Sequence, residues 1–186
     1  MIWVIGNGES RLPVNVNNLQ GTKIGCNAIY RDYTVDHLVC VDKRMAKEAQ
    51  LKFAGPLYTR PDWKYASLLT VPELPFPQET RADEPIHWGS GPYAVYIACT
   101  LDTEINLLGF DLYSKDKNVN NVYKGTQGYV KETHHAIDPR YWIHQVGKII
   151  QYFPSHKFTI YQEDDWEIPE SWLESNITLD KISSLL

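Results

Sequence analysis

The sequence predicts an α/β protein with a Rossmann-like, open and mostly parallel sheet, flanked by helices in a single domain. Short apolar runs, punctuated by turn residues and separated by helix-like stretches, recur along the chain, as expected for parallel strands joined by crossover helices. Several runs are apolar at consecutive positions, which is typical of strands covered on both faces. A chain of 186 residues lies in the one-domain range and can bury a sizeable core.

The predicted elements follow in order along the chain. Apolar runs at residues 2–5, 23–26, 37–41, 104–108 and 157–161 are predicted strands, and residues 43–52 and 91–101 are predicted helices. Asp138-Pro139 indicates an N-cap followed by proline at the first helical position, opening a helix that reaches Tyr152. Apolar residues recur in this last helix at spacings of three and four, so one face is apolar.

Two segments lack such patterns. Residues 55–85 contain six prolines, which break a long helix and remove donors from a central strand, so an irregular segment over the sheet is expected there. We therefore assign residues 1–163 to a Rossmann-like nucleotide-binding domain and residues 164–186 to a C-terminal tail. The tail carries Trp166 and Trp172 among acidic residues, a composition suited to docking on the body or on a partner subunit, and homo-oligomers are compatible with it.

Composition excludes some classes of function. The formal charge of −5 works against binding a nucleic-acid polymer, which requires clustered Lys and Arg, whereas a single nucleotide remains allowed. Cys26, Cys40 and Cys99 lie inside apolar runs without metal-binding spacing and are expected to be reduced thiols in the core. The chain shows no basic leader before a long apolar stretch, which predicts a cytoplasmic protein without a membrane span.

Glycines and polar residues follow the predicted strands at their carboxyl ends, the edge at which open α/β sheets bind ligands. After the first strand, Gly6 and Gly8 would let backbone N–H groups approach a phosphate closely. Asn7 and Ser10 add side-chain donors, and Asn27 follows the second strand. A plain tight turn would use the same two glycines, so the motif alone does not distinguish a phosphate-binding loop from a turn.

Further candidates follow the later elements. Ser90-Gly91 offers a second glycine-containing helix start with a hydroxyl group, although Ser90 could equally be a simple N-cap. Asp42 follows the third predicted strand, and Asp111 and Tyr113 follow the fourth. Asp42 and Asp111 could together hold a Mg²⁺ that bridges phosphates. Alternatively, Asp111 hydrogen-bonds the glycine turns around it and organises the site.

Residues 114–135 form a polar segment between the last two predicted strands. A long loop after a strand end is a natural lid or acceptor-contacting flap, and its lysines Lys115, Lys117 and Lys124 could neutralise phosphates. The alternative is a mobile surface loop. His87, beside the Ser90-Gly91 turn, is a second-choice site residue.

Four blocks of sequence together resemble a known family. They are GNGES at 6–10, GCNAIY at 25–30, WGSGPYAVYIACTL at 88–101 and INLLGFDLYS at 105–114. Their order and spacing resemble the bacterial sialyltransferases of glycosyltransferase family 42, and are similar to their relatives, the archaeal 6-hydroxymethylpterin pyrophosphokinase-like proteins. The resemblance implies that Gly8, Asn27, Ser90 and Tyr113 contact the cytidine monophosphate part of a donor, with Asn7 at another donor or active-site contact.

The same resemblance bears on catalysis. His134-His135 lies about where the sialyltransferases carry the His that deprotonates the acceptor hydroxyl, and His is readily poised for that transfer near neutral pH. Adjacent histidines point in different directions, so at most one is expected to serve; the alternative is that both are exposed loop residues. The chain departs from the family at two positions: Glu9 stands where the family usually has Pro, and Asp42 stands where the sialyltransferases have Asn. The chain is also shorter than those enzymes, so their acceptor specificity cannot be transferred to it.

Three functions are compatible with these residues. The first is a glycosyltransferase that passes a sugar from a nucleotide-activated donor to an acceptor hydroxyl without a cofactor, with Tyr113 and Tyr123 hydroxyls stabilising the leaving phosphate. The second is a Mg²⁺-dependent pyrophosphokinase-type transfer from ATP or GTP to a small alcohol, with Asp42 and Asp111 as metal ligands. The third is a nucleotide-binding or structural protein that retains the fold without chemistry.

Overall fold

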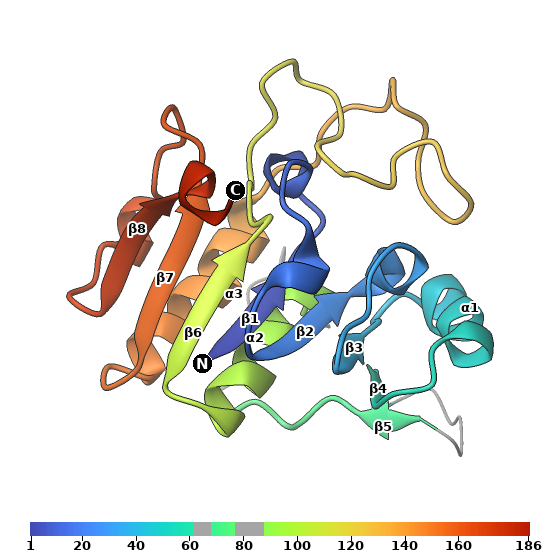
Figure 1. The fold of residues 1–186 in the computed structure, drawn as a ribbon, viewed down its shortest axis with the longest axis horizontal. Helices are drawn as coiled ribbons and strands as arrows, with labels where there is room; N and C mark the ends of the chain where they lie inside the picture. Colours follow the sequence, from blue (N-terminus) through green and yellow to red (C-terminus); the bar gives the residue numbers. More distant parts are fainter. Residues whose placement is uncertain (62–67, 77–87) are drawn as a thin grey trace.

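The structure is a computed structural model that describes residues 1–61, 68–76 and 88–186. Its centre is a single eight-stranded sheet with the strand order β5-β4-β3-β2-β1-β6-β7-β8 (Figure 1). Every neighbouring pair is parallel, and the central strand β1 is in register with β2 on one side and with β6 on the other. The predicted α/β class and parallel sheet are therefore confirmed.

Five strands lie where the sequence predicts them. They are β1 (Ile2–Ile5), β2 (Thr22–Cys26), β3 (His37–Val39), β6 (Glu104–Leu108) and β7 (Lys157–Gln162). All four residues of β1 are buried, because both faces of the strand are covered. Strand β3 ends two residues earlier than expected, before the chain turns into α1.

The expectation that residues 55–85 are irregular is wrong for two short stretches. Strand β4 (Leu57–Thr59) pairs with β3, and β5 (Leu69–Thr70) pairs with β4 at the edge of the sheet. Pro56 precedes β4 and contributes only its carbonyl oxygen, which accepts a hydrogen bond from the Leu38 amide at 2.9 Å. A proline at this place removes no donor from the ladder, so the strand forms beside it.

The C-terminal tail also adds to the sheet. Strand β8 (Ile177–Lys181) pairs in parallel with β7, from Phe158 opposite Ile177 onward. Before it, the short helix η4 (Glu170–Trp172) places Trp172 fully inside the protein, where its indole Nε1 donates to the Ile143 carbonyl at 2.8 Å. The tail thus docks on the body of its own chain.

The helices cover both faces of the sheet. Helices α2 (Ser90–Leu101) and α3 (Arg140–Tyr152) pack together on one face, which buries Val4. Helix α1 (Lys43–Lys52) lies on the opposite face with Trp3 and Ile5. Short helices lie on that face or along the edges: η1 (Glu9–Arg11), η2 (Val16–Asn18), η3 (Asn27–Arg31) and η5 (Ile182–Leu185).

Two helix starts differ slightly from the sequence prediction. Helix α3 begins at Arg140, one residue late, because Pro139 occupies the N-cap, while the Asp138 carboxylate accepts from the Arg140 amide at 2.9 Å. Helix α2 begins at Ser90, with Gly89 as its N-cap. None of the helices in the described parts of the chain is long and apolar enough to cross a membrane.

Candidate functional site

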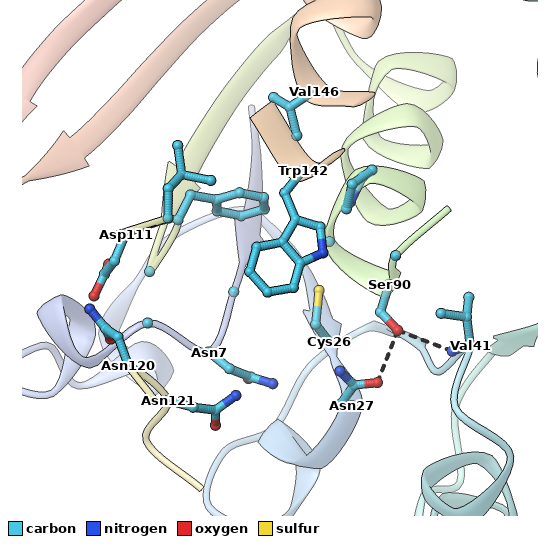
Figure 2. Close-up of a pocket in the computed structure, with 18 of the residues that line it drawn as sticks. Asn7, Cys26, Asn27, Val41, Ser90, Asp111, Asn120, Asn121, Trp142 and Val146 are labelled. Carbon is cyan, nitrogen blue, oxygen red and sulfur yellow. Dashed lines mark hydrogen bonds between the residues drawn. The ribbon is translucent and has the colours of Figure 1, made fainter. Parts of the chain in front are cut away.

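A cavity of about 330 Å³ opens at the carboxyl ends of the central strands. Strand β1 lies between β2 and β6, so the chain winds away from β1 in opposite directions on its two sides. Open α/β sheets bind ligands at such a reversal point. The lining comes from the loops after four strands, the starts of α2 and α3, and the 114–135 segment (Figure 2): Gly6, Asn7, Gly8, Cys26, Asn27, Val41, Asp42, Gly89, Ser90, Gly91, Pro92, Gly109, Phe110, Asp111, Leu112, Asn120, Asn121, Trp142 and Val146.

The glycine turn after β1 is packed directly against the turn after β6. The Gly6 amide donates to the Leu108 carbonyl at 2.8 Å, and the Gly8 amide donates to the Gly109 carbonyl at 2.9 Å. A Cβ atom at Gly8 would overlap the Asp111 carboxyl group, which explains glycine there. These two amides are therefore not available to cradle a phosphate, contrary to the expectation from the sequence.

Asp111 fixes the glycine turn after β1 through hydrogen bonds to Ser10. Its buried carboxylate accepts hydrogen bonds from the Ser10 amide at 2.9 Å and from the Ser10 hydroxyl at 2.5 Å. Ser10 is thus turned toward Asp111 and does not line the cavity. The hydrogen bonds favour the organising role for Asp111 over that of a metal ligand.

Asp42, the other proposed metal ligand, also has a structural partner. Its Oδ1 atom accepts from the Arg44 and Met45 amides at 2.9 and 3.1 Å, so it is the N-cap of α1. Within the described residues, no group of three or more His, Cys, Asp or Glu side chains is arranged to hold a metal ion. The carboxylates of this edge therefore do not fit a Mg²⁺ site between them.

Ser90 joins the start of α2 to the ends of two strands. Its hydroxyl donates to Asn27 Oδ1 at 2.9 Å and accepts from the Val41 amide at 3.0 Å (Figure 2). The simple N-cap interpretation is therefore wrong, since the hydroxyl bonds neighbouring loops and the N-cap is Gly89. Asn27 itself adopts a left-handed backbone with a φ of 54°. Its amide nitrogen has no partner among the described residues and lies beside the cavity.

The first turn of α2 supplies the backbone donors that the glycine turn lacks. The amides of Ser90 and Gly91 belong to the first turn of a helix, where N–H groups have no intrahelical partner. Both residues line the cavity. This is the end of a helix at which the macrodipole favours an anion. An anion in the cavity would be bound most favourably at this end of α2.

Side-chain amides provide most of the remaining polar lining. Asn7 donates through Nδ2 to the Tyr129 hydroxyl at 3.3 Å, and its buried Oδ1 atom has no hydrogen-bond partner within the described chain. Asn120 accepts from the Glu9 amide, and Asn121 accepts from the Tyr123 amide. Among the described lining residues there is no Lys, Arg or His. The polar lining of the cavity therefore consists mainly of neutral groups.

The thiol that lines the cavity is not reactive. Burial raises the pKa of Cys26 to about 12, an effect that the positive charge of Arg11 reduces only in part. Because the thiolate is the nucleophile and the thiol is not, Cys26 stays inert near neutral pH. It serves as an apolar part of the cavity floor.

Arg11 is a buried cation that the sequence did not single out. It is 2% exposed, its Nη2 donates to the Tyr123 hydroxyl at 3.0 Å, and its guanidinium lies over the rings of Tyr33 and Tyr123 at 5.7 and 5.5 Å. Such ring contacts stabilise a cation removed from water. Arg11 thereby joins the loop after β1 to the 114–135 segment.

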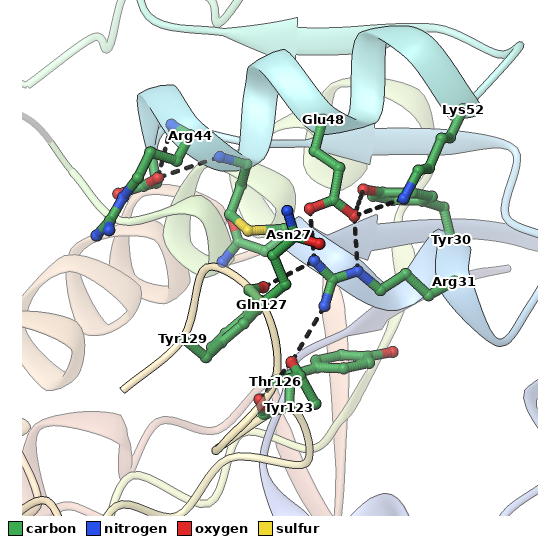
Figure 3. Close-up of polar contacts among 12 residues, drawn as sticks. Asn27, Tyr30, Arg31, Arg44, Glu48, Lys52, Tyr123, Thr126, Gln127 and Tyr129 are labelled. Atoms are coloured by element: carbon green, nitrogen blue, oxygen red, sulfur yellow. Dashed lines mark hydrogen bonds and ion pairs between the residues drawn. The ribbon is translucent and has the colours of Figure 1, made fainter. Parts of the chain in front are cut away.

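The 114–135 segment reaches the cavity through Asn120 and Asn121 and is held to the body by bonds from residues further along it. Arg31 on η3 forms an ion pair with Glu48 on α1 at 2.7 Å, and it also donates to Thr126 and to the Gln127 carbonyl at 3.1 and 2.9 Å (Figure 3). Tyr123 is buried. The segment lies beyond the arrowhead of β6 (Figure 1) and is held there by these bonds.

Two of its lysines are already paired. Lys124 contacts Glu9 at 2.9 Å, and Lys115 contacts Glu163 and Asp165 at 2.6 and 3.1 Å. Lys124 therefore neutralises the negative charge that Glu9 places beside the turn. These pairs favour a structural role over the expected one of neutralising phosphates.

The predicted catalytic histidines lie apart from the cavity. His134 and His135 are both exposed, and His135 forms an isolated antiparallel bridge with Asn118. Neither lines the cavity described above, and neither does Tyr113, which is 40% exposed. His87 lies outside the described residues. The structure thus gathers most of the expected binding residues and leaves the expected base elsewhere.

Several lining residues were not expected from the sequence. Trp142 projects from α3 into the cavity (Figure 2), although the sequence suggested only a place on the apolar helix face. Trp142 is 38% exposed, so its ring is only partly packed in the core. Phe110 carried no signal beyond its nearness to a predicted strand end, and Asn120 and Asn121 were expected only as members of the polar 114–135 segment.

Comparisons of the chain with protein-family models, with curated proteins and with solved structures gave no match. The fold and the site therefore stand on the chain's own residues.

Proposed function

We propose that the cavity binds a nucleotide and that the chain is a glycosyltransferase resembling the sialyltransferases, which transfers a sugar from a nucleotide-activated donor to an acceptor hydroxyl. The proposal rests on one observation above all: Ser90, Gly91 and Asn27 meet at a cavity on the edge where the winding of the sheet reverses. Asn27 and Ser90 are among the positions that the resemblance assigns to donor binding.

The proposed roles follow from the available donors. The Ser90 and Gly91 amides at the start of α2 bind the phosphate, and the free amide nitrogen of Asn27 binds a neighbouring oxygen. The ring of Trp142 packs on the nucleoside. One of His134 and His135 acts as the base on an acceptor that approaches from the exposed side of the 114–135 segment.

A second candidate, a nucleotide-binding protein without catalysis, also has an observation in its favour. The ionisable carboxylates among the described lining residues, Asp42 and Asp111, both accept hydrogen bonds from the protein. No other side chain of the described lining offers a proton-accepting group suited to neutral pH. The metal-dependent pyrophosphokinase alternative has less support, because it requires these same two carboxylates as ligands.

Thermal-shift measurements distinguish the candidates. Cytidine monophosphate, uridine diphosphate, ATP and GTP are each added with and without Mg²⁺, and the melting temperature is recorded. Stabilisation by a cytidine or uridine nucleotide without metal supports the glycosyltransferase, and metal-dependent stabilisation by a triphosphate supports the pyrophosphokinase. The absence of a shift with every nucleotide would contradict both.

Single variants then separate binding from chemistry. Asn27→Ala is expected to abolish the nucleotide shift, while Asn18→Ala, at an exposed asparagine far from the cavity lining, retains it. His135→Ala is expected to keep the shift and to remove turnover of a nucleotide sugar. Turnover that persists in both His134→Ala and His135→Ala leaves neither histidine as the base.

A further inference from the structure

A second cavity of about 230 Å³ adjoins the first. Val41, Gly89 and Trp142 line both cavities, so the two share a wall at the start of α2. A phosphate bound at the Ser90 and Gly91 amides would therefore sit next to this shared wall, within reach of both spaces.

The lining of the second cavity differs in kind from that of the first. Three aromatic residues, Trp88, Tyr141 and Trp142, provide its apolar surface. Gln145, Arg60 and Asp138 add an amide and charges of both signs. A ligand with apolar faces and a polar edge can contact both the rings and the polar groups of this lining.

Gln145 provides a polar group that points to a hydrogen-bonding ligand. It is 1% exposed, and its Oε1 atom accepts from the Gly89 amide at 3.2 Å. No hydrogen bond from its Nε2 group to another described residue is found, so this group can donate to a ligand. A ligand hydroxyl in the cavity could accept a hydrogen bond from Nε2.

From these features we infer that the second cavity is the subsite for the glycosyl group of the donor. A single sugar ring carries hydroxyl groups around its edge and C–H groups on its faces. The faces would pack on Tyr141 and Trp142, and the hydroxyls would bind Gln145 and the charged rim. The nucleoside then lies in the first cavity, with the phosphate at the shared wall.

This inference rests on the proposed nucleotide site, so its test compares a nucleotide with its own sugar conjugate. Titration calorimetry measures cytidine monophosphate against its N-acetylneuraminic acid conjugate, and uridine diphosphate against uridine diphosphate glucose. For the pair that binds, the sugar conjugate is expected to bind about tenfold more tightly than the nucleotide. The ratio of the two dissociation constants reports the second cavity alone.

Variants at Tyr141 test whether this affinity ratio arises in the second cavity. Tyr141→Ala is expected to bring the ratio close to one without changing the affinity for the nucleotide, while Tyr141→Phe keeps most of it because the ring remains. Tyr152→Ala is the matched control, since Tyr152 is an exposed tyrosine of the same helix that lines neither cavity.

The outcomes separate the two proposals. A nucleotide that binds with no gain from its sugar, or a gain that Tyr141→Ala leaves intact, overturns the glycosyl subsite while the nucleotide site stands. Failure of all four compounds to bind the wild-type protein overturns the proposed function, and this inference with it.

Discussion

The loop after β1 and the His134-His135 segment were both expected to belong to one active site, yet their surroundings differ sharply. The loop is fixed by Asp111, by the turn after β6 and by the buried Arg11, and it borders the cavity. The two histidines are exposed and line neither cavity. The binding half of the proposed activity is thus built into the core, whereas the catalytic half depends on an exposed segment.

The largest effect is expected from removing the Asp111 carboxylate. Asp111→Ala leaves the buried amide and hydroxyl of Ser10 without an acceptor, and the free energy of unfolding should fall by about 3 kcal/mol. Urea denaturation measures the change. Asp116→Ala is the control, because the hydrogen-bond partners of Asp116, Ser114 and Asn118, lie in its own exposed loop. Equal losses in both variants would show that the loop after β1 is not held by Asp111.

A methyl group at Gly8 tests the contact between the two turns. Gly8→Ala forces a Cβ atom into the Asp111 carboxyl group, and we expect a loss of about 2 kcal/mol in unfolding free energy. At Gly91, also in the cavity lining, a Cβ atom would lie 3.4 Å from Phe110, an ordinary contact, so Gly91→Ala should keep the stability. Chemical denaturation of both variants decides; a Gly8→Ala protein as stable as Gly91→Ala would contradict the packing described.

The Arg31–Glu48 pair, whose arginine also bonds the 114–135 segment, should make stability depend on pH. The hydrogen bond from Arg31 lowers the pKa of Glu48 from 4.5 to about 2. Because the folded-state pKa is the lower one, this stabilisation is complete above the unfolded-state value and is lost as the pH falls from 4.5 towards 2.

Glu48→Gln should therefore cost about 1.5 kcal/mol at pH 7, where the charged hydrogen bond is intact. The difference from the wild type should shrink as the pH falls through that window, which denaturation at a series of pH values can follow. A difference that stays constant down to the acid end would mean that folding does not lower the pKa of Glu48.

Much of the fold could be predicted because buried parallel strands leave continuous apolar runs. Three strands were not predicted. Pro56 beside β4 obscured a run of three residues, β5 has only two residues, and β8 lies among polar residues of the tail with most of its residues exposed. The candidate site was predictable in its positions, because strand ends converge by topology. Its hydrogen bonds were not, since only the packed structure shows that Ser10 turns to Asp111 and that Ser90 bonds to Asn27.

The central claim is that a nucleotide binds where α2 begins. Amide resonances of the protein labelled with ¹⁵N, followed by NMR during titration with the nucleotide that gives the largest thermal shift, test it most directly. We predict saturable shifts for the amides of Asn27, Ser90 and Gly91, with those of His134 and His135 unchanged. Shifts that leave these first three amides unperturbed would contradict the account.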